Sequence, residues 1–418
     1  MAGPERDRRM IYRARAVLPI TGPPLVPGWV DVDRGRIVRA GPGLEDPKGS
    51  GVEDLGDVAI LPGLVNAHTH LELSWMAGRV PQAGSMVEWI RNLILQRVSG
   101  PPGGDDEVVA AARRAAAAMR DTGTVLAGDI SNTLMSPAVL AELGLSAAIF
   151  HEMLAFSAPD PAAIVDEAWQ RIDRLSVAGE GHSANAPEFA FSVVAHAPYS
   201  VAPALFAEIA RQRRSAPLSV HLGESPEEIA FLRTGGGPFR DLLEDLGAWT
   251  DAWTTPACDP VEYLARVGHL APPILIVHAV HLDDPALERL RDVGAVVVTC
   301  PRSNLWVGAG LPRVAHFYGT GVPVAIGTDS LASTSTLNMF DELAELRRIA
   351  PDVSAASLLD SATRVGAEAL GFGGEYGTIE PGRRAALVAV DLPGAVGDVE
   401  EYLVSGVPAH AVRRLPAG

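Results

Sequence analysis

Eight short apolar runs, each followed by a stretch of helical character, make up the middle of this chain. This alternation is typical of βα units and of a parallel sheet. Eight such units predict a TIM barrel, an α/β fold whose catalytic groups lie at the carboxyl ends of the strands. We expect strands at Leu64–His68, Thr124–Asp129, Ala147–His151, Phe191–His196, Leu218–His221, Ile274–His278, Ala295–Thr299 and Val322–Asp329. We expect helices at Glu107–Thr122, Pro161–Ala178, Ala202–Arg214 and Asp284–Val293.

The two ends of the chain show a different pattern, with brief β-prone runs between Gly, Pro and Asp turns. These runs are Ile11–Val17, Trp29–Val32 and Arg36–Ala40 near the start, and Ala386–Asp391, Tyr402–Val404 and Ala409–Val412 near the end. They predict a small β-sandwich domain built from residues 1–60 and 375–418, flanking a catalytic barrel at 61–374. The stretch 234–264 is interpreted as an insertion between the fifth and sixth strands, of open role.

Composition excludes several classes of protein. The net charge is −17, so the chain lacks the basic surface that nucleic acid requires. Only Cys258 and Cys300 are present, which excludes a disulfide framework. The charged start, Met1–Arg9, does not resemble a secretory signal, and no run of 18 apolar residues predicts a membrane span. We therefore expect a cytoplasmic protein that binds neither nucleic acid nor membrane; a homo-oligomer is left open.

Imidazole and carboxylate groups recur at the carboxyl ends of the expected strands. They are His68, His151, His196, His221, His278 and Asp329. In a TIM barrel these ends share one face, so the sequence predicts one polar site there.

A metal site is the first interpretation of this face. His68 and His70 are two residues apart, so they point the same way from the end of a strand. With His221 and Asp329 they provide three imidazoles and a carboxylate, a set that holds catalytic zinc and leaves a position for water. One divalent ion is expected, zinc in preference to iron. The alternatives are two packed histidines and an ordinary turn aspartate.

Two further groups at this face are candidate proton carriers. Glu224 lies three residues after His221, where a carboxylate can move a proton between water and a leaving group. It also precedes Ser225 and Pro226, so the alternative is an acidic residue favoured at a helix start. His278 is placed to orient the attacking water, whereas His281 is interpreted as structural.

Together these residues resemble the amidohydrolase superfamily, in its mononuclear deaminase and chlorohydrolase branch. The resemblance covers essentially the whole chain. It implies that His68, His70, His221 and Asp329 bind one metal, that Glu224 protonates a ring nitrogen, and that His278 and Asp329 activate water. Binuclear members bridge two metals with a carboxylated lysine after strand four; the only lysine here, Lys48, precedes strand one.

Other segments narrow the resemblance. Ala195–Ser200 and Met86–Ile90 are similar to segments of adenosine-type deaminases, which implies that His196 contacts the purine and Glu88 the ribose; a plain helix start is the alternative for Glu88. Thr299–Asn304, with Phe231–Pro238 and His68–Glu72, resembles the aminodeoxyfutalosine deaminases of menaquinone biosynthesis.

This resemblance implies a small-molecule partner, a 6-aminopurine nucleoside converted to its 6-oxo form with release of ammonia. Ser303 is a candidate substrate contact. Because that nucleoside carries a carboxylate, an arginine should bind it. Arg302 ranks first, before Arg233, Arg91 and Arg97, and a surface position is the alternative for each.

Two other functions stay open at this point. The same barrel and metal could deaminate S-adenosylhomocysteine, methylthioadenosine or guanine, or dechlorinate a triazine. A barrel that binds a ligand without turnover is disfavoured, because all metal ligands and both proton carriers are present.

Overall fold

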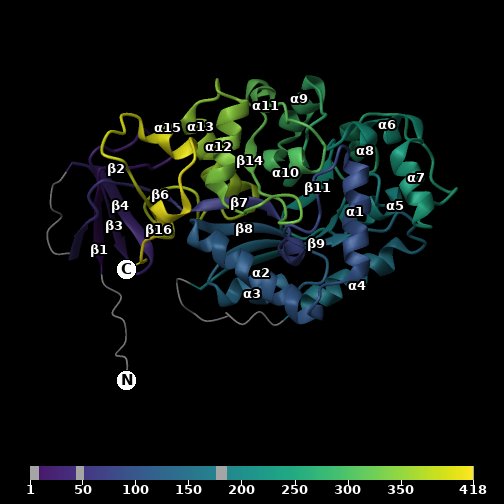
Figure 1. The fold of residues 1–418 in the computed structure, drawn as a ribbon, viewed down its shortest axis with the longest axis horizontal. Coiled ribbons are helices and arrows are strands. Elements are labelled where there is room, and N and C mark those ends of the chain that lie inside the picture. Colours follow the sequence, from purple (N-terminus) through teal and green to yellow (C-terminus); the bar gives the residue numbers. More distant parts are fainter. Residues whose placement is uncertain (1–8, 44–50, 176–185, 418) are drawn as a thin grey trace.

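The computed structural model describes residues 9–43, 51–175 and 186–417. The first eight residues, Lys48 and the end of the helix expected to reach Ala178 lie outside this described part. Within it, a barrel occupies the middle of the chain and a smaller sheet region is built from both ends (Figure 1).

The barrel has eight parallel strands, as the sequence predicts. They are β7 (Leu64–Thr69), β8 (Thr124–Ser131), β9 (Ser146–Met153), β10 (Phe189–Ala195), β11 (Leu218–Leu222), β12 (Ile274–His278), β13 (Val296–Thr299) and β14 (Val324–Ile326). They pair in chain order as two halves, β7 to β10 and β11 to β14. His221 N donates to His196 O at 2.9 Å on one side, and Asp329 N donates to His68 O at 3.0 Å on the other. These bonds close the circle and confirm the TIM barrel.

The strands are almost wholly buried because helices cover the outside of the barrel and side chains fill its interior. Local signals set the helix ends, as α9 (Asp284–Val293) illustrates. The Asp283 side chain accepts from Ala286 N at its start, and Gly294, with φ of 77°, ends it. The other helices on the barrel are α1 (Met86–Ser99), α2 (Gly104–Asp121), α3 (Ser136–Glu142), α4 (Pro161–Asp173), α5 (Pro203–Arg211), α6 (Pro226–Thr234), α7 (Pro238–Asp245), α8 (Pro260–Arg266), α10 (Pro301–Trp306), α11 (Val314–Thr320), α12 (Met339–Ile349), α13 (Ala355–Asp360) and α14 (Gly366–Ala369).

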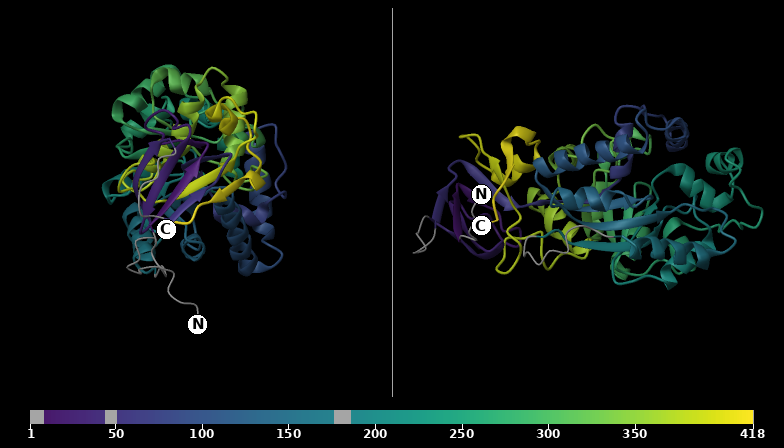
Figure 2. Two further views of the ribbon diagram at one scale, coloured as in Figure 1. Left: turned by 90° about the vertical axis from the view of Figure 1, so that its left-hand side faces the viewer. Right: turned by 90° about the horizontal axis from the view of Figure 1, so that it is seen from below.

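Both chain ends contribute to the smaller region, which lies beyond one end of the barrel (Figure 2). One sheet has the order β4-β3-β1-β5 and the other β16-β15-β6-β2. The strands are β1 (Met10–Ala14), β2 (Ala16–Val17), β3 (Gly28–Asp33), β4 (Arg36–Pro42), β5 (Gly51–Asp54), β6 (Val58–Pro62), β15 (Leu387–Asp391) and β16 (Val412–Arg414). β15 pairs with β6, so the last segment of the chain is tied to the first.

The predictions of strands at Tyr402–Val404 and at Ala409–Val412 are wrong. Tyr402–Val404 lies in a helix, α15 (Val399–Val404), and Ala409–Ala411 forms a short 3-10 turn before β16. The Asp398 side chain accepts from Glu401 N and starts α15, while Val399 and Leu403 are buried at helical spacing. A short apolar run does not distinguish the period of a helix from that of a strand.

The stretch 234–264 does lie between β11 and β12, and it contains α7 and the start of α8. Its Trp253 stacks on Phe231 with ring centroids 4.7 Å apart, which ties the insertion to the barrel. α7 also contacts α1, so the two helices lie together above one side of the barrel face. Among the described residues, no helix has both the length and the apolar character needed to cross a membrane.

Candidate active site

Four histidines gather at the carboxyl face of the barrel. His68 and His70 come from the end of β7, with their Nε2 atoms 3.1 Å apart. The rings of His221 and His278 lie 4.9 and 5.7 Å from that of His68, centroid to centroid. All four side chains are buried. The strand ends therefore bring together the imidazoles that the sequence singles out.

The donor set fits a divalent metal ion. Burial lowers the pKa of His70 to about 3 and of His221 to about 4, so these rings are neutral and their nitrogens can act as ligands. His221 Nδ1 lies 3.0 Å from the His196 carbonyl oxygen, which leaves Nε2 free to face the cluster. Asp329 Oδ1 lies 3.6 Å from His70 Nε2. Three overlapping ligand groups result: His68 with His70 and Asp329, His68 with His221 and His278, and Glu152 with His196 and His221.

Asp329 is held in an unusual backbone conformation. Its φ is +60°, in the left-handed region that a residue with a side chain rarely adopts, at a cost of roughly 1–3 kcal/mol. Ser303 Oγ donates to Asp329 Oδ2 at 2.6 Å and lies 2.8 Å from Ser333 Oγ. Burial raises the pKa of Asp329, and the Ser303 hydrogen bond opposes that rise. Ser303 thus contacts the aspartate.

The backbone of His278 is also in the left-handed region, with φ of +74°. Asn304 Nδ2 lies 2.9 Å from His278 Nδ1, so an amide that donates there places the imidazole proton on Nε2. Nε2 in turn lies 3.5 Å from Glu224 Oε1. Two neighbouring residues of α10, Ser303 and Asn304, therefore orient two different groups of the site.

Glu224 is a buried carboxyl group beside the histidine cluster. Burial, reinforced by the charges of Asp329 and Glu228, raises its pKa well above the ordinary value. Backbone N–H groups of Gly223 and Glu224 donate to the Glu228 carboxylate at 2.9 and 3.1 Å, which fixes the turn that carries Glu224. A carboxyl group that stays protonated at neutral pH can donate a proton to a bound molecule.

A cavity opens above these groups. Its base is formed by His70, His196, His221, Glu224, His278 and Asp329. Its outer wall is mostly apolar, and α1 and α7 supply Met86, Trp89, Ile90, Leu93, Ile94, Phe239, Leu242 and Leu243. Polar side chains also line the cavity, among them Arg97, Asn132 and Glu152. The cavity thus combines titratable groups at its base with a mostly apolar outer wall.

His196 lies in the cavity as expected, with its ring 4.7 Å from that of His221 and its Nδ1 2.6 Å from Ser200 Oγ. Glu88 does not: its side chain is exposed, and its Oε2 accepts from Gly84 N at 3.2 Å. Ser85 Oγ accepts from Glu88 N in return. The Ser85 side chain thus caps α1 and Glu88 accepts from the residue before that cap, which corresponds to the helix-start alternative for Glu88.

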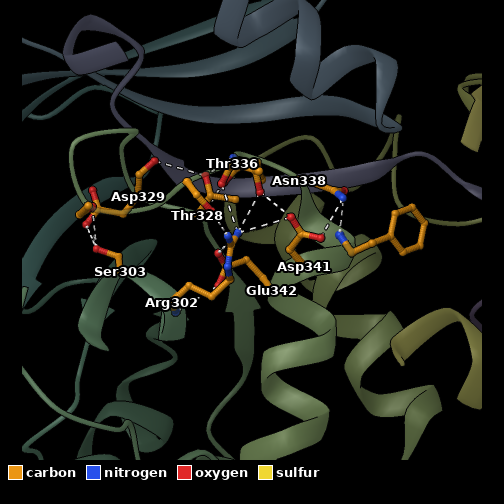
Figure 3. Close-up of polar contacts among 12 residues, drawn as sticks. Arg302, Ser303, Thr328, Asp329, Thr336, Asn338, Asp341 and Glu342 are labelled. Carbon is orange, nitrogen blue, oxygen red and sulfur yellow. Dashed lines mark hydrogen bonds and ion pairs between the residues drawn. The ribbon is translucent and has the colours of Figure 1, made fainter. Parts of the chain in front are cut away.

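Arg302, the candidate ranked first for binding the substrate carboxylate, does not line the cavity. Figure 3 shows the Arg302 side chain directed at Thr336 and Glu342. Its Nη1 lies 3.0 Å from Thr336 Oγ1 and 3.4 Å from the buried Glu342. The Glu342 carboxyl group is fully buried in α12, and both the backbone N–H and the guanidinium of Arg302 donate to it, which holds the arginine there. Arg91 pairs with Asp245 and Arg233 is exposed. Of the four candidates, Arg97 is the arginine that lines the cavity.

Sequence reasoning missed Glu152 and Asn304. The expected strand stops at His151, whereas β9 continues to Met153 and turns Glu152 into the cavity. His151 Nδ1 lies 2.9 Å from Ser131 O and takes a structural position. Asn304 lies in the segment Thr299–Asn304, but its contact with His278 joins residues that are far apart in the sequence and is formed only in the folded chain.

Comparison with known proteins agrees with this geometry. The amidohydrolase family model matches residues 59–413. The 5-methylthioadenosine/S-adenosylhomocysteine deaminase of Nitratidesulfovibrio vulgaris is 30% identical over 413 residues, covering 94% of this chain and 86% of that protein. The aminodeoxyfutalosine deaminase of Deinococcus radiodurans is 30% identical over 343 residues, covering 76% and 75%.

Solved structures show the same fold. A zinc-bound adenosine deaminase from Xanthomonas campestris superposes with a TM-score of 0.78 at 26% identity, covering 99% of this chain and 93% of that one. A Helicobacter pylori aminofutalosine deaminase in complex with methylthio-coformycin gives a TM-score of 0.82 at 22% identity, covering 97% and 100%.

Proposed function

The chain belongs to the amidohydrolase family, and we propose that it is a metal-dependent deaminase that replaces the 6-amino group of an adenine nucleoside with oxygen and releases ammonia. One observation carries this proposal. A buried carboxyl group with a raised pKa, Glu224, lies beside a four-histidine and aspartate cluster at the base of one cavity. Hydrolysis of an amino-substituted ring needs an activated water and a proton donor together.

His68, His70, His221 and Asp329 are the residues that hold the metal in this proposal. One divalent ion is expected. Both zinc and iron accept imidazole and carboxylate donors, and zinc is favoured because the Xanthomonas campestris deaminase of the same fold binds it. When bound, such an ion supplies a water that loses a proton near neutral pH. The chain's only lysine is Lys48, which comes before the barrel, so a bridging carboxylated lysine cannot hold a second ion.

The remaining steps fall to the chain's own groups. Asp329 accepts the proton that water gives up, and His278, with its proton on Nε2, orients the attack on C6. Glu224 donates its proton to the neighbouring ring nitrogen, after which proton transfer to the amino group allows ammonia to leave. His196 contacts the purine. One water is consumed and one ammonia is released for each nucleoside.

The apolar wall of α1 and α7 supports an apolar 5′ substituent on the nucleoside. We therefore take methylthioadenosine as the first substrate candidate. S-adenosylhomocysteine, whose 5′ thioether ends in a charged amino acid, stands beside it because a relative is named for both activities. The second candidate is 6-aminodeoxyfutalosine, the carboxylated substrate of menaquinone biosynthesis. Arg97, at the cavity wall, is the cation that favours it.

The test is ammonia release by zinc-loaded protein from methylthioadenosine, S-adenosylhomocysteine, 6-aminodeoxyfutalosine and adenosine. We expect kcat/KM to be higher for the 5′-extended nucleosides than for adenosine. A preference for 6-aminodeoxyfutalosine that Arg97→Ala abolishes selects the second candidate. The Glu224→Gln protein is the control for catalysis by other proteins in the preparation. Absence of ammonia from all four contradicts the proposed function.

A further inference from the structure

Glu152 is a buried carboxylate that the proposed deamination does not use. It comes from the end of β9, is 5% exposed, and lines the cavity. Asn132 Nδ2 donates to its Oε2 and to its backbone oxygen, both at 3.1 Å. This pair of bonds fixes the position of the carboxylate before any ligand binds.

The second carboxylate oxygen has no such partner. Oε1 lies 3.6 Å from His221 Nδ1, beyond hydrogen-bond distance, and that nitrogen already pairs with the His196 carbonyl oxygen at 3.0 Å. A cavity-lining oxygen without a protein partner is open to a hydrogen bond from a bound molecule. Since Glu152 lines the cavity, a bound molecule can supply the donor.

The position of Glu152 in the barrel indicates which part of a nucleoside it meets. The groups assigned to the reaction, Glu224, His278 and Asp329, follow β11, β12 and β14, so the reacting edge of the purine faces those strands. Glu152 lies at the end of β9, on another side of the circle, where Asn132 donates to it and Arg97 in turn donates to Asn132. A methylthioadenosine molecule has hydrogen-bond donors only on its 6-amino group, which faces the other strands, and on its two ribose hydroxyls.

We propose that Glu152 accepts a hydrogen bond from a ribose hydroxyl and makes the enzyme specific for ribonucleosides over their deoxy analogues. This inference rests on the proposed function. It assigns to Glu152 the sugar contact that the sequence resemblance implies for Glu88, whose carboxylate instead caps α1.

The test compares kcat/KM for methylthioadenosine with that for its 2′-deoxy and 3′-deoxy analogues. In the wild-type protein, removal of the contacted hydroxyl should lower kcat/KM roughly 10- to 100-fold, the cost of leaving a buried hydrogen-bonding group without its partner. In Glu152→Gln the ribonucleoside should lose a similar factor, while the analogue that lacks that hydroxyl changes less than about twofold. Glu167→Gln, the same substitution on the exposed face of α4, should leave every value unchanged.

Equal losses for all three nucleosides in Glu152→Gln, or no discrimination by the wild-type protein, would overturn the inference. Calorimetric binding of methylthioinosine and its deoxy forms to metal-free protein gives a readout without turnover. If no nucleoside is deaminated, the proposed function fails. The calorimetric affinities for methylthioinosine and its deoxy forms then test the role of Glu152 separately. Preference for the ribonucleoside that Glu152→Gln abolishes supports the contact, and absence of preference refutes it.

Discussion

Gly327 lies where β14 approaches β7 most closely, two residues before Asp329. A Cβ atom added there would lie 2.8 Å from both Cβ and the carbonyl oxygen of His68, and 3.0 Å from Cys300 Sγ. That carbonyl accepts from the backbone N–H groups of Thr328 and Asp329, each at 3.0 Å. Gly327→Ala should therefore push apart the two strands that carry His68 and Asp329. Overpacking of this kind lowers the free energy of unfolding by about 1–3 kcal/mol.

The same substitution at Gly319 provides the matched control. Gly319 lies in the exposed part of α11, and an added Cβ meets no atom within 4 Å. Gly319→Ala should raise the free energy of unfolding by about 0.5–1 kcal/mol, because alanine favours the helix. Urea unfolding of both variants measures these opposite changes, and zinc affinity should fall only in Gly327→Ala. A Gly327→Ala protein with wild-type stability and zinc affinity would refute the close-approach argument.

Three further predictions concern single side chains. Glu224→Gln should lower kcat by a factor of roughly 10² to 10⁴ with little change in product binding, as steady-state kinetics and calorimetry can test. Ser303→Ala removes the hydrogen bond to Asp329 and should lower kcat/KM about tenfold, whereas an unchanged value would mean that Ser333 alone positions the carboxylate. Burial raises the pKa of Glu342 to about 8 from an ordinary 4.5, so the folded protein retains a proton that the unfolded chain releases. The free energy of unfolding should therefore fall as pH rises from about 4.5 to 8, and Glu342→Gln should reduce that slope in urea titrations at several pH values.

The barrel and the positions of its strand-end groups could be predicted because both depend on local pattern. A buried parallel strand is an apolar run, and its end is marked by the first polar residue. His68, His221 and His278 follow such runs, and the closed circle brings them together whatever the details of the helices.

Side-chain partners could not be predicted in the same way. Arg302 is close in sequence to the site, but its direction is decided by Glu342, forty residues later. Glu88 is turned outward by the capping geometry at Gly84 and Ser85. Glu152 lies in the cavity because β9 continues two residues beyond the expected strand end at His151. These outcomes depend on tertiary contacts that a single sequence does not display.

Zinc titration of metal-free protein, with ammonia release from methylthioadenosine as the readout, tests the central claim most directly. The account predicts that activity is absent without metal, rises in proportion to added zinc and stops rising at about one ion per chain. Activity that is independent of metal, or that requires a second equivalent, would contradict a single ion held by the histidine and aspartate cluster.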